Sequence, residues 1–498
     1  MAAKESKKVF KNLIGGKWVD SASGKTRPNL NPADTRVPLG VAPQSTAADA
    51  NAAVEAARAA AKGWRKTPAP KRGVILTAAA RILERRKEEI VHMLTAEEGK
   101  CPSEAGGEVQ RAINAMEFLA GEGRRMNGET IPSELPSNFL YAFREPLGVV
   151  ALITPWNFPI AIPAWKAAAA LITGNTVVLK PAELTPWCAN ALAECLQEAG
   201  VPDGVFNVVH GEGEDVGEAL VQNKHVHAIS FTGSNEVGHH IATAAGARRA
   251  KVQLEMGGKN AVLVLADADL DLAANGIAMG AFGSTGQRCT ATSRVVADKK
   301  IAKKLIEMVA ERAAKLQVGP GGDSVSYMGP SVDESQMNTV LKYLDVAKKE
   351  GVELVCGGKR LTSGDHAHGF FVAPTIYTKV KAKMRLAQEE IFGPVLSVIE
   401  VDGVEEAIET GNDSLFGLAG SIYTQDVNAV FRYIEDLEAG MLHVNSATVG
   451  GEVQVPFGGM KGTGFGGREM GNTAVDFFTE WKSVYIDYTG VSRKTNVY

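Results

Sequence analysis

Cys289 and Glu255 are the side chains of this sequence whose types and surroundings point most directly to chemistry. Cys289 lies in the run GQRCT, and Glu255 lies 34 residues upstream in the run LEMGGKN. A thiol can add to a carbonyl carbon and carry the acyl group as a thioester. A partly buried carboxylate can activate the water that hydrolyses this thioester. The simpler alternatives are a small buried thiol and a charge at an exposed strand end.

Asn157 lies in TPWNFP, an apolar loop stiffened by prolines, where a buried amide needs a hydrogen-bonding partner. Its side-chain N–H group could stabilise a developing oxyanion, or the residue could bond its own backbone in a turn. The run KPAE places Lys180 and Glu183 directly after an apolar strand. That position suits contacts with ribose hydroxyls, and a solvated loop pair is the alternative.

Two glycine-rich segments could approach a phosphate group. The run FTGSNEVG, residues 231–238, ends a strand and opens a helix, whose first backbone N–H groups could face a pyrophosphate. The run GEGEDVG, residues 211–217, is closer to a glycine fingerprint. Its three acidic residues would repel phosphate, however, so we interpret it as a decoy loop. Farther along, EEIFGP places Glu390 beside a turn, where a helix-terminal charge is the alternative.

The composition is that of an ordinary globular protein. The chain has 498 residues, 45% of them hydrophobic and 22% charged, with a formal net charge of −4. This length predicts about two to four domains. The near-balanced charge gives no reason to expect a nucleic acid or a membrane surface as partner. The most apolar stretch, residues 148–165, contains Asn157 and three prolines, so we predict a strand, a loop and a helix start instead of a membrane span.

The cysteines favour a reducing compartment. They are five in number and form no CxxC pair, and the N-terminal residues are polar, unlike a secretory signal. We therefore expect free thiols and a cytoplasmic location. No metal-ligand spacing is present in the sequence, so we expect no metal.

Alternating strands and helices predict a parallel sheet that positions these residues. Its strands should be Val149–Ile153, Thr176–Leu179, Val205–Val209, Ala228–Phe231 and Val252–Leu254. The helical stretches between them imply right-handed crossovers and helices on both faces. Ligands bind such sheets beyond the carboxyl ends of the strands, where Lys180 and Glu255 fall.

Further elements flank this sheet on both sides along the chain. Residues 12–32 read as short strands, residues 47–64, 72–98 and 103–126 as helices, and residues 138–145 as a strand. A second α/β series has strands near Ala261–Leu265, Ser293–Val296, Val395–Val401 and Ser421–Tyr423. The alternating tail, residues 482–488, could pair with the strand near Tyr141. Its edge would be exposed on a monomer, so we expect a homo-oligomer.

The chain resembles the aldehyde dehydrogenase superfamily from about Asn12 to Asp487. The shared runs, in order, are TPWNFP, KPAE, FTGSNEVG, LEMGGKN, GQRCT and EEIFGP, with PFGGMK near the end. The resemblance implies an α/β fold with two Rossmann-like domains and a small β oligomerisation domain. Residues 1–126 and 146–257 would form the dinucleotide-binding domain, residues 258–480 the catalytic domain, and residues 127–145 and 481–498 the oligomerisation strands.

The resemblance also implies a role for each matching residue. Cys289 would add to the aldehyde, Asn157 and the Cys289 backbone N–H would hold the oxyanion, and Glu255 would activate water. Lys180 would belong to the catalytic set as well as to the cofactor site. NAD(P)+ would take the hydride, and its contacts would be Ile153, Thr154, Pro155, Trp156, Lys180, Glu183, Gly213, Gly233, Ser234, Gly238, Glu390 and Phe392.

Local runs resemble the 2-oxoglutarate semialdehyde (2,5-dioxopentanoate) dehydrogenases, namely AGEG at 120–123, AIPAWK at 161–166 and GAFGSTGQRCTATSR at 280–294. A carboxylate-bearing aldehyde needs a cation, for which Arg125 and Arg288 are candidates, with surface arginines as the alternative. Trp165, a further candidate for a substrate contact, lies where succinate semialdehyde dehydrogenases usually carry an arginine. Because residues 461–468 are one residue longer than in most relatives, the role of Glu469 stays open.

Several alternatives to this substrate remain. They are succinate, glutarate and betaine semialdehydes, glyceraldehyde-3-phosphate, an aromatic aldehyde, acyl transfer to coenzyme A, and an inactive binding protein. The presence of Glu255 argues against acyl transfer to coenzyme A, and the intact catalytic set argues against inactivity. Glu183 would repel a 2′-phosphate whereas Lys180 could hold one, and the subfamily resemblance favours NADP+ slightly. We expect a homodimer or a homotetramer.

Overall fold

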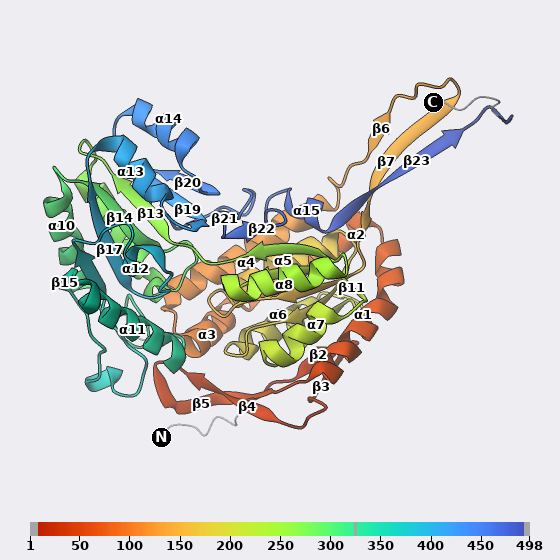
Figure 1. The fold of residues 1–498 in the computed structure, drawn as a ribbon. Coiled ribbons are helices and arrows are strands. Elements are labelled where there is room, and N and C mark those ends of the chain that lie inside the picture. The colour runs from red at the N-terminus through yellow and green to blue at the C-terminus, as the bar shows by residue number, and fades with distance from the viewer. Residues whose placement is uncertain (1–7, 323–325, 493–498) are drawn as a thin grey trace.

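The parallel sheet predicted from the central apolar runs is present in the computed structural model, which describes residues 8–322 and 326–492 (Figure 1). The outermost residues of the predicted segments 1–126 and 481–498 lie outside the described residues. This sheet has the strand order β22-β12-β11-β8-β9-β10-β2-β3. Its five parallel members are β8 (Val149–Ile153), β9 (Thr176–Lys180), β10 (Phe206–Val208), β11 (Val226–Thr232) and β12 (Lys251–Glu255). Antiparallel strands extend it at both ends: β2 (Asn12–Ile14), β3 (Lys17–Val19) and β22 (Gly464–Phe465).

Helices cover both faces of this sheet, which explains why β8 and β9 are buried at every position. Val149 and Ala151 pack against one helical layer, and Val150 and Leu152 against the other. The first layer consists of α1 (Ala47–Lys66), α7 (Glu218–Gln222) and α8 (Asn235–Ala247). The second consists of α2 (Ala69–Arg85), α3 (Lys87–Glu98), α4 (Pro102–Glu122), α5 (Ala161–Ile172) and α6 (Pro186–Glu198). The stretch 72–98, predicted to be helical, is divided into α2 and α3, because the backbone at Arg86 leaves the helical region.

A second α/β unit follows in the chain, as predicted. Its sheet has the order β15-β16-β17-β14-β13-β19-β20. The strands are β13 (Asn260–Val264), β14 (Thr292–Asp298), β15 (Glu353–Cys356), β16 (Thr375–Thr378), β17 (Val395–Val401), β19 (Ala419–Tyr423) and β20 (Met441–Val444). β15, β16 and β20 were not predicted from the sequence. Two helices cover one face, α9 (Leu270–Phe282) and α10 (Ala302–Lys315). Four cover the other, α11 (Glu334–Glu350), α12 (Arg385–Gln388), α13 (Gly403–Asn412) and α14 (Val427–Asp436).

The C-terminal tail pairs with the strand near Tyr141, as predicted. β23 (Thr479–Asp487) lies antiparallel to β7 (Asn138–Pro146), with Val484 opposite Tyr141. β6 (Glu129–Ile131) adds a third strand, and this sheet projects away from the two α/β units (Figure 1).

The remaining elements are short or lie at the periphery. They are β1 (Lys8–Val9), β4 (Thr26–Asn31), β5 (Asp34–Pro43), β18 (Phe416–Gly417), β21 (Met460–Lys461), α15 (Ala474–Phe477) and the turns η1 (Gly213–Gly217), η2 (Gly283–Gly286) and η3 (Gly364–His366). The segment 148–165 forms β8, a loop and the start of α5, as predicted. Within the described ranges, no helix is long and apolar enough to cross a membrane.

Candidate active site

The carboxyl ends of the parallel strands bring several predicted residues to one edge of the first sheet. Ile153 is paired with Lys180 on one side and with Phe231 on the other. Thr232, the next residue of β11, is paired with Glu255. Parallel pairing thus holds the ends of four strands in register, and the loops that follow them surround a common space.

Cys289 and Glu255 both line a cavity of about 490 Å³ beyond this edge. Phe158, Ile162 and Trp165 contribute to its largely apolar wall. An apolar, partly enclosed cavity excludes water and strengthens the electrostatic interactions inside it. The cavity therefore combines a nucleophile and a potential base in surroundings suited to carbonyl chemistry.

The Cys289 thiol is held in its neutral form in this structure. Burial raises the pKa of Cys289 to about 12, and the negative charges of Glu390 and Glu255 act in the same direction. The Arg111 cation opposes them without reversing the shift. Because the thiolate is the reactive form, attack by Cys289 requires a group that accepts its proton.

Glu255, the last residue of β12, is a candidate for a base in the same cavity. Its Oε2 accepts the N–H of Gly459 at 3.3 Å, and its Oε1 has no partner among the residues that the structure describes. Burial raises the pKa of Glu255 well above its ordinary value, and the charge of Glu469 adds to the effect. A carboxylate of raised pKa with one unpaired oxygen can take a proton from a thiol or from water.

Glu469, whose role the sequence left open, lies behind Glu255 in the same cavity wall. It accepts the Nε1–H of Trp165 at 2.7 Å and forms a buried ion pair with Lys166. Lys166 also donates to the hydroxyl of Ser230 at 2.7 Å. This pairing compensates the charges of Lys166 and Glu469, which leaves Glu255 as the carboxylate that lacks a cationic partner in contact.

Asn157 is joined to the segment that carries the nucleophile. Its Nδ2 donates to the carbonyl oxygen of Gln287 at 3.1 Å, and its own backbone carbonyl accepts from Lys100. Asn157 is buried in the loop between β8 and α5. The predicted oxyanion role requires this closeness to Cys289.

The turn η2, directly before the nucleophile, has an unusual backbone. Ser284 and Thr285 have φ values of 48° and 58°, and Gly286 follows at 66°. A non-glycine residue in this left-handed region costs about 1–3 kcal/mol and persists only where its surroundings hold it. The N–H of Ser284 donates to Glu104 Oε1 at 2.5 Å, and the hydroxyl of Thr285 donates to the carbonyl of Gly329 at 2.9 Å.

The two arginines proposed for the substrate are already paired with carboxylates. Arg288 lies 3.1 Å from Glu104, and Arg125 lies 2.6 Å from Glu122. Arg125 is also absent from the cavity that contains Cys289 and lines a separate wide depression, which corrects its sequence-based placement. Arg125 lies beyond the C-terminal end of α4, and Arg111 lies within this helix, roughly three or more helical turns away. Arg288 lines an adjoining depression, not the cavity itself.

Among the described residues that line this cavity, Arg111 on α4 is the one cation, and it was not predicted from the sequence. Its guanidinium lies 5.5 Å from the ring centroid of Trp165, and its buried Nε has no partner among the described residues. Burial lowers the pKa of Arg111, and a thiolate at Cys289 and the carboxylate of Glu108 act in the opposite direction. A usable signal was its position in the sequence, between the apolar residues Val109 and Ala112 of a predicted helix.

The predicted ribose contacts Lys180 and Glu183 lie together at the end of β9. Lys180 Nζ is 3.1 Å from Glu183 Oε2. Burial raises the pKa of Glu183, but the Lys180 cation, a backbone hydrogen bond and the charge of Arg27 together hold this pKa below its usual value. Thr154 is buried in the next loop, and its hydroxyl has no partner among the described residues. The loops that follow β8 and β9 can therefore offer both a carboxylate and a hydroxyl to a ligand.

The predicted pyrophosphate site lies at the start of α8. Ser234 precedes the helix, and its hydroxyl accepts the N–H of Val237 at 3.4 Å. A Cβ on Gly238 would lie 2.4 Å from the sulfur of Met256, and one on Gly233 would lie 2.5 Å from the ring of Phe231. Both glycines are therefore needed where the helix packs closely on the sheet.

The remaining cofactor candidates divide into a cluster and one distant residue. Glu390 Oε1 accepts the N–H of Gly258 at 2.9 Å, and burial raises the pKa of Glu390 to about 7. The rings of Trp156 and Phe392 meet edge to face at 5.4 Å. Pro155 is half-buried in the same loop as Trp156. Gly213, in contrast, is exposed at the start of η1 and lines neither of the two hollows beside Cys289.

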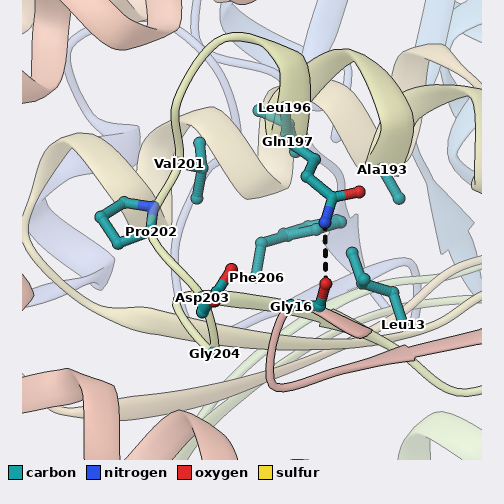
Figure 2. Close-up of a pocket in the computed structure, with 10 residues that line it drawn as sticks. All are labelled: Leu13, Gly16, Ala193, Leu196, Gln197, Val201, Pro202, Asp203, Gly204 and Phe206. Carbon is teal, nitrogen blue, oxygen red and sulfur yellow. Dashed lines mark hydrogen bonds between the residues drawn. The ribbon is translucent and has the colours of Figure 1, made fainter. Parts of the chain in front are cut away.

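Another hollow, of about 230 Å³, lies between the turn after β2 and α6 (Figure 2). Gln197 Nε2 donates to the carbonyl of Gly16 across it at 2.8 Å. Asp203 is the one titratable residue among its described lining residues. A lone acid without a base or nucleophile does not make a reaction site, so we interpret this hollow as a packing gap. No group of three potential metal-binding side chains was found among the described residues.

Comparisons with known proteins agree with this geometry. Residues 18–484 match the aldehyde dehydrogenase family. The chain is 45% identical to an alpha-ketoglutaric semialdehyde dehydrogenase of Bacillus subtilis, covering 96% of this chain and 98% of the relative. It is also 45% identical to an alpha-ketoglutarate semialdehyde dehydrogenase of Haloferax volcanii, covering 96% and 99% of the two chains.

A solved structure shares the fold over nearly the whole length. It is a betaine aldehyde dehydrogenase from Staphylococcus aureus in complex with NAD+, with a TM-score of 0.94 and 34% identity. The match covers 97% of this chain and 95% of that one. The fold and the sequence thus point to the same group of proteins.

Proposed function

The chain belongs to the aldehyde dehydrogenase family, and on this basis we propose that it oxidises 2-oxoglutarate semialdehyde to 2-oxoglutarate with NAD(P)+. The observation that carries the proposal is the cavity shared by Cys289, Glu255 and Arg111. The first two residues supply the chemistry of aldehyde oxidation. Arg111 supplies a half-buried cation whose buried Nε is unpaired among the described residues, which suits an aldehyde that carries a carboxylate at its other end. The names of the relatives support the same class of substrate.

The proposed reaction has two halves. Cys289 Sγ adds to the aldehyde carbon while its proton passes to solvent water, and the amide of Asn157 and the Cys289 backbone N–H stabilise the oxyanion. Loss of a hydride then leaves a thioester. In the second half Glu255 takes a proton from water and the hydroxide adds to the thioester carbon. The adduct collapses to the acid and the Cys289 thiolate, which recovers the proton from Glu255. The aldehyde thereby loses two electrons and gains one oxygen atom from water.

The residues present fit a nicotinamide dinucleotide, which supplies the hydride acceptor when it is bound. Lys180 and Glu183 would hold the adenosine ribose, and the first N–H groups of α8 would face the pyrophosphate. Glu390 and Phe392 would contact the nicotinamide end. The anionic Glu183 favours a free 2′-hydroxyl, whereas Lys180 could hold a 2′-phosphate. We therefore propose that the enzyme accepts both cofactors. A slight preference for NADP+ is supported by the subfamily resemblance alone.

Arg111→Leu tests the carboxylate contact. We expect it to raise KM for 2-oxoglutarate semialdehyde at least about tenfold, because a lost charge-assisted contact costs about 1.5–3 kcal/mol. KM for an uncharged aldehyde of similar length should change less than twofold. The measurement is reduced-cofactor formation over a panel of acidic, uncharged and aromatic aldehydes, with NAD+ and NADP+ tested separately. Arg125→Leu, beyond the end of the same helix, is the matched control and should behave as the wild type.

Three results of the panel would change the proposal. A wild type that prefers uncharged or aromatic aldehydes would remove the carboxylate-bearing substrate. A preference for succinate semialdehyde would keep the chemistry and change the acid. An Arg111→Leu enzyme with unchanged KM for every acidic aldehyde would show that another group binds the carboxylate.

We also propose that the sheet β6-β7-β23 joins subunits of a homodimer or homotetramer. Among the described residues, no further strand pairs with the outer edges of this sheet, and the sheet exposes large side chains at Phe139, Trp481 and Tyr485, as is typical of a subunit contact. Removing residues 482–498 should therefore give a monomer or an aggregate in light scattering. A chain that ends at Tyr488 keeps β23 and should assemble as the wild type does. An unchanged oligomer without residues 482–498 would contradict the proposal.

A further inference from the structure

We propose that Glu104 is a positioning residue for Cys289. Its carboxylate holds the left-handed turn η2 in the conformation that presents the thiol and the backbone N–H of Cys289 to the aldehyde. This inference rests on the proposed role of Cys289 as the nucleophile. Glu104 contacts both the turn η2 and Arg288. Only a few residues separate this turn from Cys289 in the sequence.

Glu104, Ser284 and Arg288 form a closed set of contacts. Glu104 Oε1 accepts the N–H of Ser284 at 2.5 Å and lies 3.1 Å from Arg288 Nη2. Arg288 Nε in turn donates to the hydroxyl of Ser284 at 2.9 Å. The side chains of Glu104 and Arg288 are only 14% and 18% exposed, so water screens this set weakly.

These contacts are made by a residue whose backbone needs support. Ser284 has a φ of 48°, and the next residue, Thr285, has a φ of 58°. Thr285 has its own tie to Gly329, but Ser284 has its N–H and its hydroxyl tied to Glu104 and Arg288. Without Glu104, the N–H of Ser284 loses its acceptor, and Arg288, which bonds the Ser284 hydroxyl, loses its ion-pair partner. The turn can then relax toward an ordinary backbone conformation. Cys289, five residues later in the chain, would then move.

Glu104 is part of a stripe along α4 that serves the whole cavity. Glu108, four residues later, accepts the N–H groups of Ile160 and Ala161 at 2.9 and 3.2 Å and so holds the end of the loop that carries Asn157. Arg111, seven residues after Glu104, lines the cavity. Residues at these spacings share one face of a helix. One helix face therefore orients the nucleophile segment and the Asn157 loop.

The experiment compares Glu104→Ala with Glu104→Ala/Ser284→Gly. We expect kcat of the single variant to fall about 10- to 100-fold, because a displacement of about 1 Å at the reacting groups has an effect of that order. KM for the cofactor should stay within twofold. Adding Ser284→Gly should recover at least about fivefold in kcat, since glycine adopts positive φ without steric cost. Glu117→Ala, a half-buried change on the same helix whose carboxylate pairs with Arg81, is the control for helix stability and should leave kcat unchanged.

A residue that only stabilised the fold would lower the melting temperature and would not be rescued by Ser284→Gly. The proposal is overturned if kcat of Glu104→Ala stays within twofold of wild type, if the change is confined to KM for the aldehyde, or if Ser284→Gly restores nothing. If Glu104→Ala does not fold, Glu104→Asp keeps the charge with a shorter reach, and the same loss and rescue are expected. Activity in Cys289→Ala would instead refute the proposed nucleophile, whereas an inactive Cys289→Ala beside a normal Glu104→Ala would refute only this positioning role.

Discussion

We expect Cys289→Ala to lower kcat for aldehyde oxidation at least about a thousandfold with either cofactor. Without the thiol no covalent adduct forms, and the aldehyde carbon then lacks the tetrahedral arrangement from which a hydride can leave. A thousandfold loss corresponds to about 4 kcal/mol of transition-state stabilisation. The measurement is the rate of reduced-cofactor formation by the pure protein at saturating aldehyde.

Cys356→Ala is the matched control for this variant. Cys356 is another half-buried thiol, but it lies at the end of β15 beside the carbonyl of Pro374, away from the cavity. Its replacement should leave kcat unchanged. If Cys289→Ala keeps more than about a tenth of the activity, the nucleophile has been misassigned.

We expect Glu255→Gln to separate the two halves of the reaction. Hydride loss can still occur once the thiol has added, but the amide cannot take a proton from water, so the thioester should accumulate. Rapid mixing should show a burst of about one reduced cofactor per subunit, followed by turnover slowed about 100- to 1000-fold. Mass spectrometry of the quenched protein should find the acyl group on Cys289. Glu406→Gln, on the exposed side of α13, is the control and should turn over normally.

The pH dependence of turnover should also change in Glu255→Gln. Burial and the charge of Glu469 raise the pKa of Glu255, so the carboxyl group is protonated at low pH and cannot act as a base. Wild-type turnover should therefore increase as the pH rises through this elevated pKa. The slow turnover of Glu255→Gln should not increase with pH in this range. A variant with neither a burst nor an altered pH profile would mean that Glu255 does not act in hydrolysis.

The main helices and strands were predictable because their hydrophobic periodicity is local. The strands β8 and β17 agree with the prediction at both ends, and the tail strand β23 pairs with β7 as expected. The strands that were missed, β5, β15, β16 and β20, have weaker patterns. All four lie at or next to an edge of their sheets, where less burial is required of the side chains and the hydrophobic pattern is weaker.

The cation of the cavity shows where local reasoning fails. Arg125 and Arg288 are both adjacent to motifs, but each is paired with a carboxylate of α4. Arg111 belongs to no motif and was overlooked. Which arginine of a long helix faces the nucleophile depends on how that helix packs against the sheet, and no short window of sequence contains this information.

The sequence alone determined the types of reacting groups. For Glu255 and Lys180 it also determined the strand ends on which they lie, because these motif residues complete or follow their strands directly. A thiol after GQR, a carboxylate at the end of β12 and an amide in TPWNFP were all evident before the fold was known. Only the tertiary structure decided which charges surround them. It paired Glu469 with Lys166, left one oxygen of Glu255 without a partner among the described residues, and joined Glu104 to the turn before Cys289. These relationships join residues up to 303 positions apart, and burial gives them their strength.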